Sequence, residues 1–438
     1  MNRTKRWSRR CARSCCKRAD PAPRRSLLVL LLFLGACSDF RYEGFLSQPI
    51  PILVTQETPV IPVLFGGRRF DAVIDTASPL TALTLGTSDT FVDGELRLQH
   101  GTQPTISRFV FHDVQVLDLS AESLDLGLDT PFTATGLLGA SILRHFAVAL
   151  DYGVSPQLTF SDEIPDTKAE LASECDPSRL VDPLTAGGER CQGTFYAPVV
   201  GGGMASIGGG DLTEIPATRL ALPLCLQPKA FDPTVLRGHG AEAQSGVPVI
   251  AVLATGIGTS IVTRTAYKRL LADDPSLSAT PGSTLHLPYG KEAVSTLTLD
   301  RIAVVSDETN ELNPCGELAL RRRFLMVPRV PLTDADLRLV QDKSVDGASA
   351  AVIQGGISFV VMDDEAPLIQ SLRRELEPQV ANIDVVLGGS FLRSFHLLVD
   401  YPSSRVILRC QTADDVCRVL PWCAQNRSST PRCPGLPD

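Results

Sequence analysis

Short apolar and alternating segments run along most of this chain and predict β strands. One is the apolar, β-branched stretch 51–64, which is followed by the pair Gly66-Gly67. Another is 69–76, where polar and apolar residues alternate before an apolar run. Further segments of the same character are 94–99, 106–117, 146–150, 247–253, 295–305, 351–362 and 397–408. Helical periodicity is convincing at 263–272 and 366–376, so the pattern predicts an all-β protein with few short helices.

The chain also contains an internal repeat. The stretch 138–152 (LGASILRHFAVALDY) aligns with 387–401 (LGGSFLRSFHLLVDY) without gaps, and the two are identical at eight of fifteen positions. An earlier pair, 72–78 (AVIDTAS) and 251–257 (AVLATGI), also aligns without a gap. Each half therefore has an apolar strand that enters a turn of small residues, and later a strand-turn-helix segment that ends in Asp-Tyr. Two similar halves in one chain predict two lobes with a cleft between them.

The N-terminus has the features of a secretion signal. Residues 1–25 carry ten Lys or Arg, and the apolar run 27–34 is followed by Gly35, Ala36 and Cys37. This run is too short to cross a bilayer, which takes about twenty apolar residues. The ending 34–37 (LGAC) resembles the bacterial lipobox, which implies cleavage before Cys37 and lipidation of its sulfur. We expect a signal peptide at 1–36, a tether at 37–48 and a protein lipid-anchored in the bacterial cell envelope. A plain signal peptide, with Cys37 incidental, is the alternative.

Charge and cysteine content narrow the possible partners. The formal charge is −8 for the whole chain and −17 once 1–36 is removed, which disfavours nucleic acid as a partner. Eight of the twelve cysteines follow Cys37, an even number that suggests up to four disulfides in an exported protein. Four of them lie in the tail 410–438, which we expect to be held by disulfides rather than by packing. The sequence does not indicate an oligomeric state.

The repeated segments resemble the aspartic peptidases of the pepsin and retropepsin type. The strand and turn 74–78 (IDTAS) look like the D-T-G-S active-site turn of that family, and 387–401 looks like its C-terminal hydrophobic-Gly segment and the strand after it. The resemblance implies a bilobal, pepsin-like all-β fold of two homologous β-barrel-like lobes. We expect an N-terminal lobe at 49–160, an interlobe connection or insertion at 161–210 and a C-terminal lobe at 211–409.

Peptide hydrolysis in this family needs two carboxylates about 3 Å apart, one from each lobe, that share a proton and a bound water. The first lobe supplies Asp75, but the matching position in the second lobe is Ala254. The resemblance implies that Thr76 and Thr255 lock the two turns together across the interface. Structural parts of both turns are thus kept, while one side has lost its catalytic acid.

The neighbouring residues show the same asymmetry. Ser78 keeps the hydroxyl that, by the resemblance, hydrogen-bonds Asp75, whereas Ile257 has replaced it on the second side. Gly256 keeps the glycine of the family's turn, and Ala77 adds a methyl group at the matching position of the first turn. The catalytic candidates are therefore Asp75, Thr76 and Ser78, beside a degenerate second site formed by Ala254, Thr255 and Gly256.

Other kinds of site lack support in the sequence. There is no H-E-x-x-H, G-x-S-x-G or Walker pattern, so we expect neither a metal nor a cofactor. His100 lies near the position of the family's flap tyrosine and is predicted to be a solvent-facing loop residue. Asp151 and Asp400 end matching strands and are predicted to be structural.

Three functions remain open. The favoured one is an envelope lipoprotein of the aspartic-peptidase family, catalytically degenerate, that binds extended peptide or protein segments in its cleft. The second is an active aspartic endopeptidase that uses Asp75 with a non-standard partner carboxylate. The third is a scaffold whose function lies in the insertion or in the Cys-rich tail.

Overall fold

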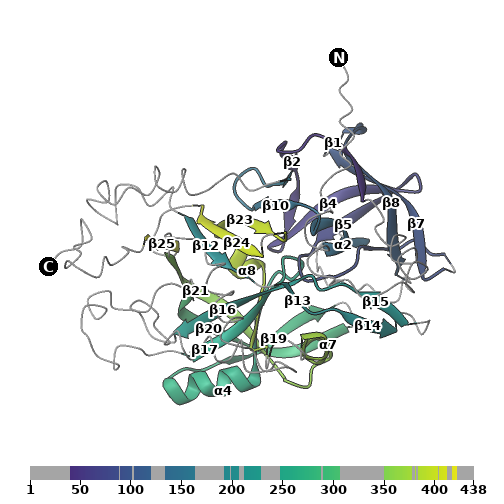
Figure 1. The fold of residues 1–438 in the computed structure, drawn as a ribbon. Coiled ribbons are helices and arrows are strands. Elements are labelled where there is room, and N and C mark those ends of the chain that lie inside the picture. The colour runs from purple at the N-terminus through teal and green to yellow at the C-terminus, as the bar shows by residue number, and fades with distance from the viewer. Residues whose placement is uncertain are drawn as a thin grey trace, which may run out of the picture. The chain divides into compact units, whose positions relative to one another are not determined.

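The computed structural model is built mainly from strands, with a few short helices (Figure 1). The residues that it describes are 40–87, 89–100, 103–119, 134–162, 192–197, 199–206, 212–227, 247–287, 290–305, 350–376, 380, 383–402, 404–411 and 417–421. The chain divides into two units, Met1–Arg41 and Tyr42–Asp438, and both halves of the repeat lie in the second. The all-β fold class predicted from the sequence is confirmed.

Six strands of the first half form a closed ring. Each pairs with its neighbour in the order β4, β7, β8, β6, β9 and β5, and β5 pairs again with β4. The strands are β4 (Thr58–Phe65), β5 (Arg68–Ile74), β6 (Ala82–Leu83), β7 (Phe91–His100), β8 (Gln103–Asp118) and β9 (Gly136–Leu138). Because no strand of the ring is left without a neighbour on either side, the first half is barrel-like.

The second half repeats this ring. The order is β16, β20, β21, β18, β22 and β17, and β17 closes the ring by pairing with β16. The strands are β16 (Arg219–Gln227), β17 (Val247–Leu253), β18 (Ser260–Thr263), β20 (Gly290–Val305), β21 (Ala350–Met362) and β22 (Val385–Leu387). The internal repeat read from the sequence is therefore a structural duplication.

The strand registers of the two rings correspond residue by residue. In the first ring β5 runs parallel to β9, with Ile74 opposite Leu138. In the second ring β17 runs parallel to β22, with Leu253 opposite Leu387. The two segment alignments, each free of gaps, pair these same residues, Ile74 with Leu253 and Leu138 with Leu387. The turns that follow β5 and β17 thus occupy equivalent places.

A separate sheet joins the two halves. Its central strands, β10 (Ala147–Asp151) and β23 (Phe395–Asp400), come from different halves and pair antiparallel, as Figure 1 shows. Ala149 lies opposite Leu398, and these two residues are themselves equivalent in the alignment of the repeat. An approximate two-fold axis therefore passes between them. The outer strands of this sheet are β2 (Ile50–Pro51), β11 (Gln157–Ser161), β12 (Gln192–Tyr196) and β24 (Arg405–Cys410).

The remaining elements are short or peripheral. The helices are α2 (Ala140–Leu143), α4 (Arg264–Asp273), α7 (Pro367–Leu376) and α8 (Gly389–Leu392). The other strands are β1 (Arg41–Gly44), β3 (Leu53–Thr55), β13 (Val199–Val200), β14 (Gly203–Ser206), β15 (Leu212–Ile215), β19 (Thr280–Leu287) and β25 (Cys417–Pro421). Helices α4 and α7 lie where the sequence predicts helices, and α2 and α8 follow the two repeated Leu-Gly segments.

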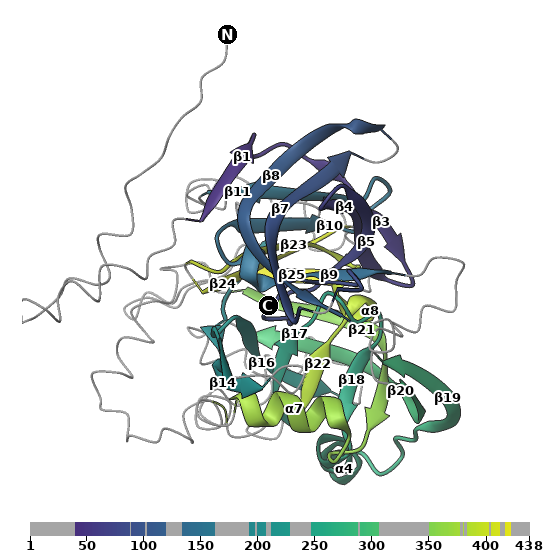
Figure 2. The same cartoon turned by 90° about the vertical axis from the view of Figure 1, so that its right-hand side faces the viewer.

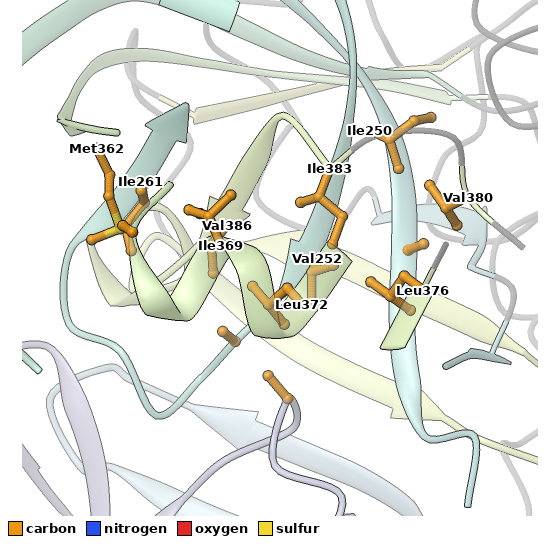
Figure 3. Close-up of a cluster of buried hydrophobic side chains, with 14 of the residues drawn as sticks. Ile250, Val252, Ile261, Met362, Ile369, Leu372, Leu376, Val380, Ile383 and Val386 are labelled. Carbon is orange, nitrogen blue, oxygen red and sulfur yellow. The ribbon is translucent and has the colours of Figure 1, made fainter. Parts of the chain in front are cut away.

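A cluster of buried apolar side chains connects strands of the second ring to α7, which Figure 2 shows beside β22 and β18. Ile369, Leu372 and Leu376 are spaced three and four residues apart, so they share one face of α7. Figure 3 shows them against side chains of the ring that include Val252 and Val386. Removing such a buried side chain costs about 2–5 kcal/mol, so α7 is firmly attached to the ring.

Several sequence predictions fall outside the described residues. These include the signal peptide 1–36, Cys37 and its lipid, and Cys175, Cys191, Cys315, Cys423 and Cys433. Part of the Cys-rich tail forms β25, which pairs with β21, so this part is paired into a sheet where we expected little packing. None of the helices in the described part of the chain has the length and apolarity needed to span a bilayer.

Candidate functional site

Asp75 and Ala254 occupy equivalent positions directly after β5 and β17. The Asp75 amide donates to the Leu138 carbonyl over 3.0 Å, and the Ala254 amide donates to the Leu387 carbonyl over 2.9 Å. The alignment of the repeat pairs these four residues in the same way. The side chain of Asp75 is partly exposed, whereas Ala254 is fully buried. The structure thus places an acid on one turn and a methyl group at the matching place on the other.

Reciprocal hydrogen bonds join the two turns through Thr76 and Thr255, both fully buried. The Thr76 hydroxyl donates to the Leu253 carbonyl over 3.1 Å, and the Thr255 hydroxyl donates to the Ile74 carbonyl over 2.7 Å. Each hydroxyl also accepts from the amide of the other threonine, over 3.3 Å and 3.0 Å. The turns are therefore held in contact by four buried hydrogen bonds that follow the two-fold relation.

The Asp75 carboxylate lies against the opposite turn. Its Oδ1 accepts from the Ala77 amide over 2.9 Å and from the Gly256 amide over 3.2 Å. A Cβ atom built on Gly256 would lie 2.5 Å from Cγ of Asp75, so a residue with a side chain would displace the carboxylate. Oδ2 has no hydrogen-bond partner among the described residues.

Arg219, at the start of β16, places a positive charge near the site. Its Nη1 donates to the Ala77 carbonyl, and its Nε donates to Oε2 of Glu375 on α7 over 2.7 Å. Burial raises the pKa of Asp75 above its ordinary value, and the two amide hydrogen bonds and the Arg219 charge oppose that rise. Among the described residues, no second carboxylate contributes to this shift. Within the described part of the chain, Arg219 is thus the charged group that opposes the rise in the pKa of Asp75, after the two amides.

Two buried tyrosines lie close enough to Asp75 for its charge to affect them. Burial first, and then the Asp75 charge, raise the pKa values of Tyr152 and Tyr401. The Tyr401 hydroxyl donates to the Thr76 carbonyl over 3.3 Å, whereas the Tyr152 hydroxyl has no hydrogen-bond partner in the described part of the chain. Both are the tyrosines of the repeated Asp-Tyr pair, so the repeat positions phenol groups near the turns.

Ser78 differs from its expected role. Its hydroxyl donates to the Leu80 carbonyl over 2.8 Å instead of reaching the Asp75 carboxylate. Its carbonyl accepts from the amide of Ala140, as the carbonyl of Ile257 accepts from the amide of Gly389. The contacts of Ser78 therefore stabilise the turn itself. Ile257, the equivalent residue of the second half, lacks the hydroxyl but keeps the equivalent hydrogen bond of the main-chain carbonyl.

A hydroxyl pair in each half was missed by sequence reasoning. Ser141 donates to the Thr81 hydroxyl over 2.9 Å, and Ser390 donates to the Ser260 hydroxyl over 2.9 Å. Each pair also bonds backbone amides around the Leu-Gly segment. The Ser that recurs in both copies of the repeat was the available signal, because α2 and α8 begin beside it.

Arg219 was also missed, and the alignment of the repeat does not mark it. Val60 lies opposite Val73 in the first ring, and Ala221 lies opposite Val252 in the second. Because Val73 and Val252 are equivalent, this register makes Arg219 the equivalent of Thr58. The chain between the paired strands differs in length between the two halves, so the gap-free alignment of the turns does not extend to these strands.

The remaining candidates take no part in this arrangement. Asp151 accepts from the Gly153 amide and from Gln411, and Asp400 pairs with Arg405 over 3.0 Å. His100 ends β7, where its backbone pairs with Gln103, and its side chain lies outside the described part. Within the described residues no cluster of His, Cys, Asp and Glu is suited to hold a metal ion.

No protein-family model matches the chain, and no curated protein matches it. Among solved structures, it is similar to an aspartic proteinase from Irpex lacteus, with 12% identity and a TM-score of 0.36. That match covers 83% of this chain and 97% of the other. The equivalence of the two turns accordingly comes from the strand registers and hydrogen bonds of this chain.

Proposed function

We propose that this protein is a catalytically degenerate relative of the aspartic peptidases that binds extended peptide or protein segments without cleaving them. The observation that carries the proposal is the pair of locked, equivalent turns with Asp75 on one and Ala254 on the other. In the family's chemistry, one carboxylate takes a proton from water while the other, kept protonated, gives one to the carbonyl oxygen. A methyl group can do neither.

The contacts of Asp75 support a binding role. Its Oδ1 is already held by two backbone amides, so Oδ2 is the oxygen available to a ligand. A backbone N–H of an extended segment would give a charge-assisted hydrogen bond there, worth about 1.5–3 kcal/mol. An extended segment could also pair with strand edges, which gives affinity through main-chain hydrogen bonds.

The cellular setting is part of the same proposal. We propose that lipid on Cys37 anchors the protein in the bacterial envelope, because the basic stretch, apolar run and LGAC ending fit a lipoprotein signal. Replacing Cys37 with Ser should move the protein from the membrane fraction to the soluble fraction and abolish labelling by a fatty acid. A Cys37→Ser variant that stays in the membrane fraction would contradict the anchor.

A peptide screen tests the binding function. Full-length protein in detergent should enrich peptides from a mixed-sequence library and leave them uncut between about pH 3 and 7. Asp75→Asn should weaken binding of an enriched peptide by about tenfold or more, because it removes the charge from the accepting group. Asp93→Asn, which changes an exposed carboxylate on β7, is the matched control and should bind normally.

The outcomes separate the alternatives. Cleavage that is lost in Asp75→Asn would show an active endopeptidase with a non-standard partner for Asp75. No enrichment of any peptide would contradict the binding function and favour a scaffold role for the insertion or the Cys-rich tail.

A further inference from the structure

The close approach of Asp75 to Gly256 sets a steric rule for the two turns. A Cβ atom on Gly256 would lie 2.5 Å from Cγ of Asp75 and 2.6 Å from its Cβ. Distances under about 3 Å between such carbon atoms are not tolerated without movement. The carboxylate of Asp75 therefore needs a glycine at position 256, which lies two residues beyond Ala254, the equivalent of Asp75. By the same rule, an acid at position 254 would need a glycine at position 77.

The opposite combination occurs on the other side of the two-fold axis. The alignment of the repeat makes Ala254 the equivalent of Asp75, and Ala77 the equivalent of Gly256. Ala77 is 7% exposed and Ala254 is fully buried, and both belong to one cluster of buried apolar side chains. Where the acid is missing, the glycine is missing too.

We propose that Ala77 and Ala254 form a matched pair in which the Ala77 methyl group occupies space that a second carboxylate would need. This inference rests on the proposed degenerate function and adds Ala77 to the residues that keep the site inactive. Ala77 excludes the second acid by its volume, although it bears no chemical group of its own. Its backbone continues to serve Asp75, because its amide donates to Oδ1 and its carbonyl accepts from Arg219.

The pair predicts strong coupling between the two positions. In Ala254→Asp alone, the new carboxylate would meet the Ala77 methyl group as Asp75 would meet a Cβ on Gly256. In Ala77→Gly alone, a small buried space opens and the turn gains backbone freedom, both of which lower stability. When both changes are present, each removes the defect that the other causes.

A double-mutant cycle tests the inference on the full-length protein. Thermal unfolding is measured for the original chain, Ala77→Gly, Ala254→Asp and the combination. We expect Ala254→Asp to lower the melting temperature by about 5 °C or more and the added Ala77→Gly to restore at least half of that loss. Losses that simply add in the double variant would overturn the inference.

A second cycle separates volume from charge. Ala254→Asn has the shape of Asp without its charge, so it should show the same rescue by Ala77→Gly. If Ala77→Gly rescued Ala254→Asp but not Ala254→Asn, charge and not space would couple the two positions. That result would also overturn the inference. Neither cycle uses a peptide, so the result is independent of the peptide-binding screen.

A spectroscopic readout completes the test. In carbon-labelled protein, the double variant Ala77→Gly with Ala254→Asp should show two carboxyl groups that titrate in coupled steps, as expected for acids sharing a proton. The double variant with Asn should show the single step of Asp75. Independent titration of the two acids would show that the carboxylates do not meet and would contradict the proposed packing.

Discussion

At the scale of single residues, the charge balance of Asp75 differs from that of a paired acid. Burial raises the pKa of Asp75, while two backbone amides and the Arg219 guanidinium oppose the rise. A shared proton would require a like charge close by, and none contributes among the described residues. Burial is therefore the largest cause of the raised pKa, although Asp75 keeps part of its surface exposed.

This shift predicts a pH dependence of stability. Because the pKa of Asp75 is higher in the folded protein, the folded state binds more protons, and the free energy of unfolding falls as pH rises through the unfolded and then the folded pKa. Asp75→Asn can accept the same amide hydrogen bonds without this titration. Denaturant unfolding from pH 3.5 to pH 7 should show the original chain losing stability relative to Asp75→Asn. An unchanged difference across that range would contradict the shift.

Replacing Arg219 should raise the pKa of Asp75 further. Arg219→Met removes the positive charge near the carboxylate and the donors to the Ala77 carbonyl and Glu375. We expect a loss of about 1–3 kcal/mol in the free energy of unfolding, with Arg219→Lys losing less because it keeps the charge. Carboxyl carbon shifts measured against pH report the titration, and identical Asp75 curves in both variants would disprove the electrostatic role.

At the scale of elements, the two turns act as one unit because the hydroxyl of each threonine hydrogen-bonds main-chain groups of the opposite turn. Asp75, Ala254 and the two threonines could be located from the sequence, since the strand and the turn align without a gap. Arg219 could not, because the loops between the paired strands differ in length and shift the alignment of β4 with β16. The partner strand of β25 was also out of reach, since a short segment does not specify which distant edge it joins.

Removing either threonine hydroxyl should weaken the contact between the halves. Thr76→Val leaves the Leu253 carbonyl and the Thr255 amide without their bonds, at a cost of about 1–3 kcal/mol. Thr76→Ser keeps the hydroxyl and is the control. Because each hydroxyl bonds backbone groups that the other hydroxyl does not use, the double Val variant should lose about the sum of the two single losses. Chemical denaturation gives these values, and a loss in Thr76→Val no greater than that in Thr76→Ser would contradict the role of the hydroxyl.

At the scale of the whole Tyr42–Asp438 unit, the two rings share one sheet through β10 and β23. The fold class and the duplication were evident from the alternating pattern and the repeat. The pairing of β10 with β23 was not evident, because the sequence of a strand does not specify which distant strand it pairs with. Its register places equivalent residues opposite each other. Most apolar residues of both strands are buried, so separating the rings would expose them.

The shared sheet predicts that the halves unfold together. Leu397 and Val399 of β23 are almost fully buried, and exposing them would cost about 1.5–3 kcal/mol for each side chain. Far-ultraviolet circular dichroism and tyrosine fluorescence should therefore show one coincident transition, and Leu397→Ala should shift both signals equally. Separate transitions would show independently stable rings.

The axis between Ala149 and Leu398 also has a historical consequence. When two identical chains assemble around such an axis, a single codon change alters both copies of a site together. Here the two copies are encoded separately within one polypeptide, so each can diverge while the other is preserved. With both copies in one polypeptide, an acid can be lost from one side and kept on the other. In a symmetric dimer of identical subunits the same change would remove both acids.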